Sequence, residues 1–271
     1  METTQVLGVD RFSPFSDAEL DTLKATDKIE VIAVYLGGPY FAGTPANKAY
    51  VESIFARDMG IVPIYVGQNK VSKGPDPVLT IKQGEADAIH AMDLFKALGI
   101  GVETGDCIFL DVESSTFAYN KAECGMYVAE WIKTVKGNDH TDGMYGSLET
   151  VDYLIRLEEP PQNFWLASWV SSTIDPMLKL DNIPGVPNSI FFNHQRGWQY
   201  AGNVGINGIV GKVDIDLFDK EYVIYQKTPV VETAPIQETK PAETVSDNPN
   251  WELEYMTLSN EIKAIFQTLK K

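Results

Sequence analysis

The amino-acid sequence predicts an α/β fold, a TIM-type (β/α) barrel over residues 1–226. Short apolar runs rich in β-branched residues alternate with segments of helical periodicity, which is typical of strands joined by helices. Eight runs occur, the number that closes such a barrel: Val6–Phe12, Val31–Leu36, Ile61–Val66, Ile108–Val112, Gly143–Gly146, Phe164–Val170, Gly197–Tyr200 and Val213–Phe218.

The composition of the runs and of the segments between them justifies the elements in turn. Val31–Leu36 is apolar on both faces, as a parallel strand covered by helices requires. Ser16, with Glu19 three residues later, is typical of a helix start. Apolar residues repeat at helical spacing within 88–95 and again within 119–132. The last part of the barrel is rich in β runs with weak helical periodicity, so we expect its final strands to be irregular.

The chain changes character after the barrel. Residues 227–250 are rich in Pro, Thr and Glu, which predicts a solvated linker. Residues 251–271 place apolar side chains at alternating steps of four and three, which predicts a short amphipathic helix. A lone helix of this length is marginal in water. We therefore expect it to dock, preferably on a second copy in a homo-oligomer, with another partner or the barrel as alternatives.

Charge and hydropathy exclude several classes of protein. The net charge is −16, from 38 acidic and 22 basic residues, and no Lys/Arg cluster interrupts the chain. Nucleic acids require a basic patch, so we reject them as partners, and the same lack disfavours an anionic membrane surface. No continuous apolar run is long enough to predict a membrane span. The N-terminus lacks the features of a classical signal peptide, so we expect synthesis in the cytoplasm.

The sharpest candidate site is the pair Asp111 and Glu113, at the carboxyl end of the fourth run. Residues two apart on a strand share a face, with Cα atoms roughly 6–7 Å apart. Two carboxyl groups in a partly desolvated site cannot both ionise easily, so the pKa of one should rise. Glu113 has the longer reach, so we expect it to be a general acid while Asp111 stays ionised and stabilises positive charge.

Further acids follow the first run and occupy the last. Asp10 ends the first run, while Asp214 and Asp216 lie in the eighth. The first and last strands of a closed barrel are neighbours, so these carboxyl groups should gather at one mouth. The simpler interpretation is scattered surface acids, which a net charge of −16 makes common.

Aromatic residues lie near the same predicted strand ends. Sugar rings have flat C–H faces that pack on aromatic rings, so some of these residues should bind substrate. Each one alone is better explained as a core residue. The candidates are Tyr35, Tyr65, Tyr145, Trp165 and Trp198.

Metal and cofactor signatures are absent from the sequence. There is no H-E-x-x-H motif and no Cys/His spacing typical of a zinc site. There is also no P-loop and no G-x-G-x-x-G after the first run. We therefore predict no cofactor and no resident metal, although an acid cluster that binds Mg²⁺ or Ca²⁺ remains an alternative.

Four motifs together resemble family 25 glycoside hydrolases, the N,O-diacetylmuramidases. These are Gly8-Val9-Asp10, Asp111-Val112-Glu113, Trp198-Gln199-Tyr200 and the run from Val213 to Phe218. The sequence is also similar to the glycoside-hydrolase-like barrels of domain of unknown function 1906, through Gly60–Tyr65, Gly84–Ala91, Met144–Gly146 and Trp165–Trp169. The resemblance covers roughly residues 5–220.

This resemblance implies an irregular barrel that cleaves the β-1,4 bond after N-acetylmuramic acid in peptidoglycan. Glu113 would protonate the leaving oxygen, and Asp111 would assist the acetamido group of the substrate or the water. Asp10 and Asp214 would shape the pocket, and Gln199 would join the substrate-binding residues. Asp216 departs from the family, in which Asn is usual, and Arg11-Phe12 replaces small residues.

Three functions therefore compete. The first is a muramidase or endolysin-like enzyme that reaches the cell wall after lysis or by non-classical export. The second is a non-catalytic barrel that binds glycan or cell wall through the same acids and aromatics. The third is a structural or assembly protein whose terminal helix forms oligomers.

Overall fold

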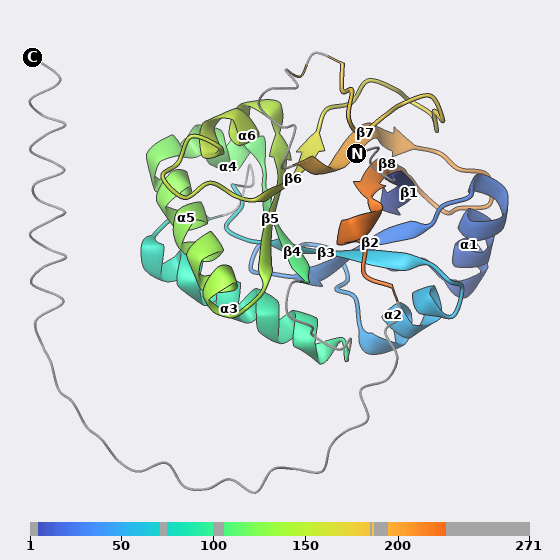
Figure 1. Cartoon of the computed structure of the whole chain (residues 1–271). Helices are drawn as coiled ribbons and strands as arrows, with labels where there is room; N and C mark the ends of the chain where they lie inside the picture. The colour runs from blue at the N-terminus through green and yellow to red at the C-terminus, as the bar shows by residue number, and fades with distance from the viewer. Residues whose placement is uncertain (1–4, 71–74, 100–105, 185, 187–194, 226–271) are drawn as a thin grey trace, which may run out of the picture. The chain divides into compact units, whose positions relative to one another are not determined.

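The eight predicted strands form a closed barrel in chain order. The structure, a computed structural model, describes residues 5–70, 75–99, 106–184, 186 and 195–225. Within them the predicted barrel is confirmed (Figure 1). The strands are β1 (Gln5–Asp10), β2 (Val31–Gly37), β3 (Gly60–Val66), β4 (Cys107–Val112), β5 (Thr141–Ser147), β6 (Asn163–Ala167), β7 (Gln195–Val204) and β8 (Val213–Asp219).

The helices lie outside the barrel and begin at polar caps. Ser16 and Glu19 form a capping box at the start of the first helix, as expected. Asn47, Thr80 and Asn120 cap later helices through their side chains. The helices are α1 (Asp17–Thr22), the π-helix η1 (Leu23–Asp27), α2 (Lys48–Phe55), α3 (Ile81–Ala97), α4 (Ser114–Tyr119), α5 (Lys121–Gly137), α6 (Leu148–Leu154) and the 3-10 helix η2 (Lys220–Tyr222).

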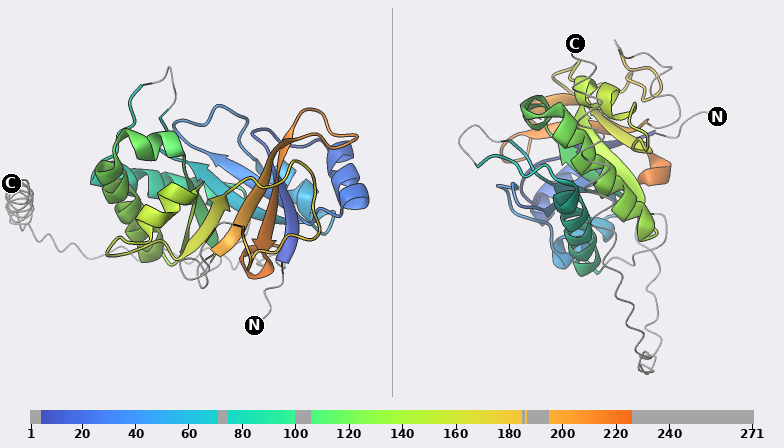
Figure 2. Two further views of the ribbon diagram at one scale, coloured as in Figure 1. Left: turned by 90° about the horizontal axis from the view of Figure 1, so that it is seen from above. Right: turned by 90° about the vertical axis from the view of Figure 1, so that its left-hand side faces the viewer.

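The last strand reverses direction. Strands β1 to β7 run parallel to one another, whereas β8 is antiparallel to both β7 and β1. Strand β8 therefore begins at the mouth where β1 ends, with Asp214 opposite Asp10. Figure 2 shows the helices around β3 to β5 and extended chain around β7 and β8. The expected irregularity of the final strands is confirmed.

Alternation along each strand separates two apolar layers. Val31, Phe109, Trp165 and Phe218 face into the barrel and pack together. The intervening residues of the strands face the helices and form a second, larger cluster. Gly197 leaves room for the Trp165 ring, since a Cβ there would lie 2.9 Å from it. Side chains of inward parity near the strand ends must therefore meet at the mouth.

No helix in the described ranges is long and apolar enough to cross a bilayer. Both cysteines, Cys107 and Cys124, are buried. The predicted linker at 227–250 and helix at 251–271 lie outside the described residues, so both stay predictions.

Candidate active site

Asp10 is the centre of a hydrogen-bonded group at the mouth. It ends β1 and is 2% exposed. The Tyr35 hydroxyl donates to Asp10 Oδ1 and the Gln199 side-chain amide donates to Oδ2, each at 2.8 Å. Burial, and then the charge of Asp214, raise the pKa of Asp10 to about 7. Asp10 is therefore poised to exchange a proton near neutral pH.

Two acids of β8 surround Asp10. Asp214 accepts a hydrogen bond from the backbone N–H of Asn203 at 2.7 Å. Asp216 lies deeper and accepts from Trp165 Nε1 at 3.0 Å. Its Oδ2 has no donor among the described residues, but its carboxyl group contacts that of Asp10. Burial and these neighbours raise the pKa of Asp216 well above its usual value, so the pair readily shares a proton.

Asp111 and Glu113 approach the same group from β4. Asp111 is buried within the strand, while Glu113 is exposed at the N-cap of α4. Burial, and then Glu113, raise the pKa of Asp111 well above its usual value. Partial desolvation by the surrounding groups at the mouth, and then the charge of Asp214, raise the pKa of Glu113, as predicted. A proton on Asp111 is favoured too, which differs from the expectation that it stays ionised, because the structure buries it completely.

Asn69 joins the two acids, and sequence reasoning missed it. It lies in the loop after β3 and is buried. Its Oδ1 accepts from the Glu113 backbone N–H at 3.3 Å and from the Thr116 hydroxyl at 3.1 Å. Its side chain also hydrogen-bonds Asp111 and lowers the pKa of that carboxyl group, against the effect of burial. The signal in the sequence was its place in the loop that follows a predicted strand.

Gln199 links two aromatic residues to Asp10. Its Oε1 accepts from the Tyr145 hydroxyl at 3.0 Å and from Trp169 Nε1 at 2.9 Å. The side-chain oxygen and amide nitrogen of Gln199 are thus oriented by neighbours from β5, from the segment after β6 and from β1. The structure therefore brings Tyr35, Tyr145 and Gln199 to the acids, and their binding of substrate stays a prediction.

The other predicted substrate-binding residues do not reach the mouth. Tyr65 and Trp198 are fully buried in the helix-facing layer, so the prediction that they contact substrate is wrong. Successive side chains of a strand point to opposite faces, and each of these residues is next to one that points into the barrel. Its own side chain therefore points toward the helices. Trp165 faces inward but is fully buried beneath the acids, so it supports Asp216 and offers no face for stacking.

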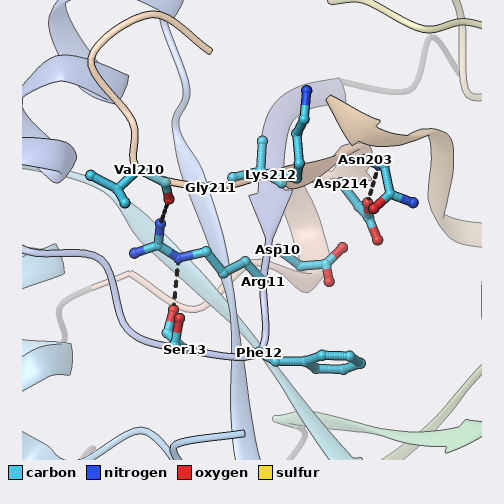
Figure 3. Close-up of a pocket in the computed structure, with 10 residues that line it drawn as sticks. Asp10, Arg11, Phe12, Ser13, Asn203, Val210, Gly211, Lys212 and Asp214 are labelled. Carbon is cyan, nitrogen blue, oxygen red and sulfur yellow. Dashed lines mark hydrogen bonds between the residues drawn. The ribbon is translucent and has the colours of Figure 1, made fainter. Parts of the chain in front are cut away.

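A cavity of about 330 Å³ opens beside Asp10 and Asp214 (Figure 3). Phe12, Asn203 and Lys212 also line it. Arg11 turns away from the carboxylates and pairs with Glu19 at 3.0 Å, so its charge is already matched. The cavity therefore combines an aromatic side chain with two acids, an arrangement suited to a polar ligand with apolar faces.

The described residues contain no group of three or more His, Cys, Asp or Glu side chains arranged to hold a metal ion. The chemistry that the described site supports is proton transfer between a carboxyl group and a ligand at the mouth, with further acids tuning the charge.

Comparison with known proteins identifies the family. The family model described as "Rv2525c-like, glycoside hydrolase-like domain" matches residues 21–223, more than half of the chain. The chain belongs to this family. The resemblance to glycoside-hydrolase-like barrels is thus confirmed, whereas a search of curated proteins found no match.

Solved structures share the fold at low identity. The Mycobacterium tuberculosis Tat-secreted protein Rv2525c, in complex with L-tartrate, is 16% identical, with a TM-score of 0.55 over 78% of this chain and 93% of that one. The Clostridium perfringens spore cortex lytic enzyme SleM is 14% identical, with a TM-score of 0.58 over 81% and 69%. The Streptococcus pneumoniae protein GHIP, a glycosyl hydrolase 25, is 13% identical, with a TM-score of 0.51 over 80% and 88%.

Proposed function

We propose that this glycoside-hydrolase-like barrel hydrolyses glycosidic bonds in cell-wall peptidoglycan. Glu113 is the general acid and Asp111 assists it. The observation that carries the proposal is the convergence of Asp10, Asp111, Glu113 and Asp214 at one mouth, where each carboxyl group has a raised pKa.

Glu113 suits the acid role because it combines access with a retained proton. Its side chain is exposed at the mouth, whereas Asp10 and Asp111 are buried. A glycosidic oxygen bound at the mouth lies within reach of a side chain of this length. Protonation of that oxygen lets the bond to the sugar carbon break as positive charge develops on the sugar ring.

The buried acids then act on the charge that develops. Asp111 orients the acetamido group of the substrate or the attacking water, and Asp10 and Asp214 supply negative potential. Asn69 holds the Glu113 backbone and the Asp111 side chain together. The similarity in fold to a spore cortex lytic enzyme and to a glycosyl hydrolase 25 supports this class of substrate.

Digestion of purified peptidoglycan tests the proposal. Wild-type protein should release fragments with new reducing ends, and Glu113→Gln should reduce the rate by about 10²–10⁴-fold. Glu85→Gln, at an exposed glutamate of α3, is the matched control and should not change the rate. Mass spectrometry of the fragments identifies the bond.

The same digest separates hydrolysis from binding alone. Wild-type protein that binds the glycan but releases no fragments would overturn the hydrolase and favour the non-catalytic glycan-binding barrel. Fragments released equally by Glu113→Gln would overturn the role of Glu113.

A further inference from the structure

We propose that Phe12 forms the apolar wall of a sugar-binding subsite next to the acids, which takes one pyranose ring of a glycan. Phe12 lies two residues after Asp10 and is 59% exposed. It lines the same cavity as Asp10 and Asp214. The subsite rests on the proposed function in one respect, because its ligand is the glycan substrate.

The Phe12 ring has a defined position. It packs edge-on against Tyr35, with ring centroids 5.2 Å apart, and against Phe41 at 5.9 Å. Tyr35 and Phe41 are stacked, with centroids 5.1 Å apart and planes at 9°. Such contacts between aromatic rings restrict the orientation of each member. Phe12 is therefore presented to the mouth on an aromatic support.

The backbone beneath the ring is also held. The carbonyl oxygen of Phe12 accepts from the Thr44 N–H at 2.9 Å. Gly43 packs so closely that a Cβ there would lie 2.0 Å from this oxygen. The loop after β2 thus fixes Phe12 from behind. A preorganised wall loses little conformational entropy when a ligand binds.

The support connects directly to the catalytic group. The Tyr35 hydroxyl donates to Asp10 Oδ1 at 2.8 Å, so the aromatic wall and this acid keep a constant spacing. Figure 3 shows the Phe12 ring and the carboxylates of Asp10 and Asp214 extending to the same side. A sugar on Phe12 would therefore lie beside the acids.

The cavity presents two chemically different surfaces. Phe12 gives a flat apolar face, while Asp214 and Asn203 give polar atoms. A pyranose has the same division, with C–H groups on its faces and hydroxyl groups at its edge. The volume of about 330 Å³ accommodates one ring. An apolar ligand would leave the carboxyl groups desolvated and unpaired, so it fits less well.

Calorimetric titration of the full chain tests the subsite. The probe is a tetrasaccharide of alternating N-acetylglucosamine and N-acetylmuramic acid. The parent and every variant carry Glu113→Gln, so that the probe is not cleaved during the titration. Phe12→Ala and Phe12→Leu should each weaken binding about tenfold, because neither keeps a flat ring. Phe12→Trp should bind within about twofold of the parent. Ile89→Ala, an exposed apolar residue on α3, is the control and should not affect binding.

Each outcome decides the proposal. Unchanged binding by Phe12→Ala, parent-like binding by Phe12→Leu, or no binding of the probe at all would overturn the subsite. Thermal unfolding of each variant checks that it is folded. If Phe12→Ala does not fold, the comparison of Phe12→Leu with Phe12→Trp still tests the subsite. If binding depends on Phe12 but protein that retains Glu113 releases no reducing ends, the proposed hydrolase activity is wrong and the subsite stands. If reducing ends are released but binding does not depend on Phe12, the subsite is wrong and the hydrolase activity stands.

Discussion

Two groups of buried acid in this barrel are built in opposite ways. On the helix side, Asp87 of α3 accepts hydrogen bonds from Gln83 Nε2 at 2.8 Å and Gln68 Nε2 at 3.0 Å. The hydroxyls of Tyr127 and Tyr65 donate to it as well, at 2.7 and 3.4 Å. These four donors come from α3, α5, β3 and the loop after β3. A buried carboxylate with this many donors ties elements together.

At the mouth, the acids mostly face one another. In addition to the effect of burial, the charge of Asp214 raises the pKa of Asp10, and the charges of Asp10 and Asp214 raise that of Asp216. Asp111 Oδ1 has no hydrogen-bond partner among the described residues. Such an arrangement destabilises the fold when the groups ionise, and it keeps protons at a surface that a ligand can reach. The comparison teaches that the supply of donors separates the structural acid from the candidate catalytic ones.

The largest effect on stability should follow Asp87→Ala. The substitution removes the shared acceptor of four donors, three of which are buried, so it should lower the free energy of unfolding by about 3 kcal/mol. Urea denaturation measures this. Exposed Asp93→Ala on the same helix is the control and should change stability by less than about 0.5 kcal/mol. A loss equally small for Asp87→Ala would remove the contrast between the two groups.

In contrast to Asp87→Ala, Asp216→Asn at the mouth should raise the free energy of unfolding. The folded pKa of Asp10 is about 7 against 3.8 for an unperturbed carboxyl group, so the folded protein binds more protons between these pH values. The contribution of Asp10 to the free energy of unfolding should therefore be greatest below about pH 4, and it should be lost as the pH rises through about 7.

Asp216→Asn replaces a buried group that can ionise with one that cannot, and it supplies a permanent donor to Asp10. It should raise the free energy of unfolding at pH 8 by about 1–3 kcal/mol and flatten its dependence on pH. Denaturation at pH 5 and pH 8 measures both effects. A variant less stable than wild type at pH 8 would contradict the account of repelling acids.

The smallest effects should come from two matched hydroxyl deletions. Tyr65→Phe removes a donor from the helix-side group, so it should cost about 1 kcal/mol of stability and leave kcat/KM unchanged. Tyr145→Phe removes a donor to Gln199, which orients Asp10, so it should lower kcat/KM several-fold. Digestion rates and urea denaturation together check the pair, and a reversed pattern would show that the two layers are assigned wrongly.

The alternation of side chains explains which site predictions succeeded. Asp10, Asp111 and Gln199 each have inward parity near a strand end, and the structure brings them together. Tyr65 and Trp198 are aromatic and near strand ends too, but they point to the helices. Composition and position alone could not separate these sets, because one step along a strand reverses the face.

Other features depended on contacts between distant segments. Asn69 and Glu113 are far apart in sequence, and only the pairing of β3 with β4 brings their loops together. The position of Phe12 depends on a loop that follows a different strand. No local pattern encodes such pairs, since each residue by itself is an ordinary loop residue.

The sequence by itself determined the number and order of the strands, the irregular end of the barrel and the acids at its strand ends, because periodicity and local propensity act over a few neighbouring residues. Only the tertiary structure decided which acids are buried, which donors reach them and which aromatic ring faces the cavity. Burial and hydrogen bonding depend on the groups that surround a side chain, and in a closed barrel those groups come from every part of the chain.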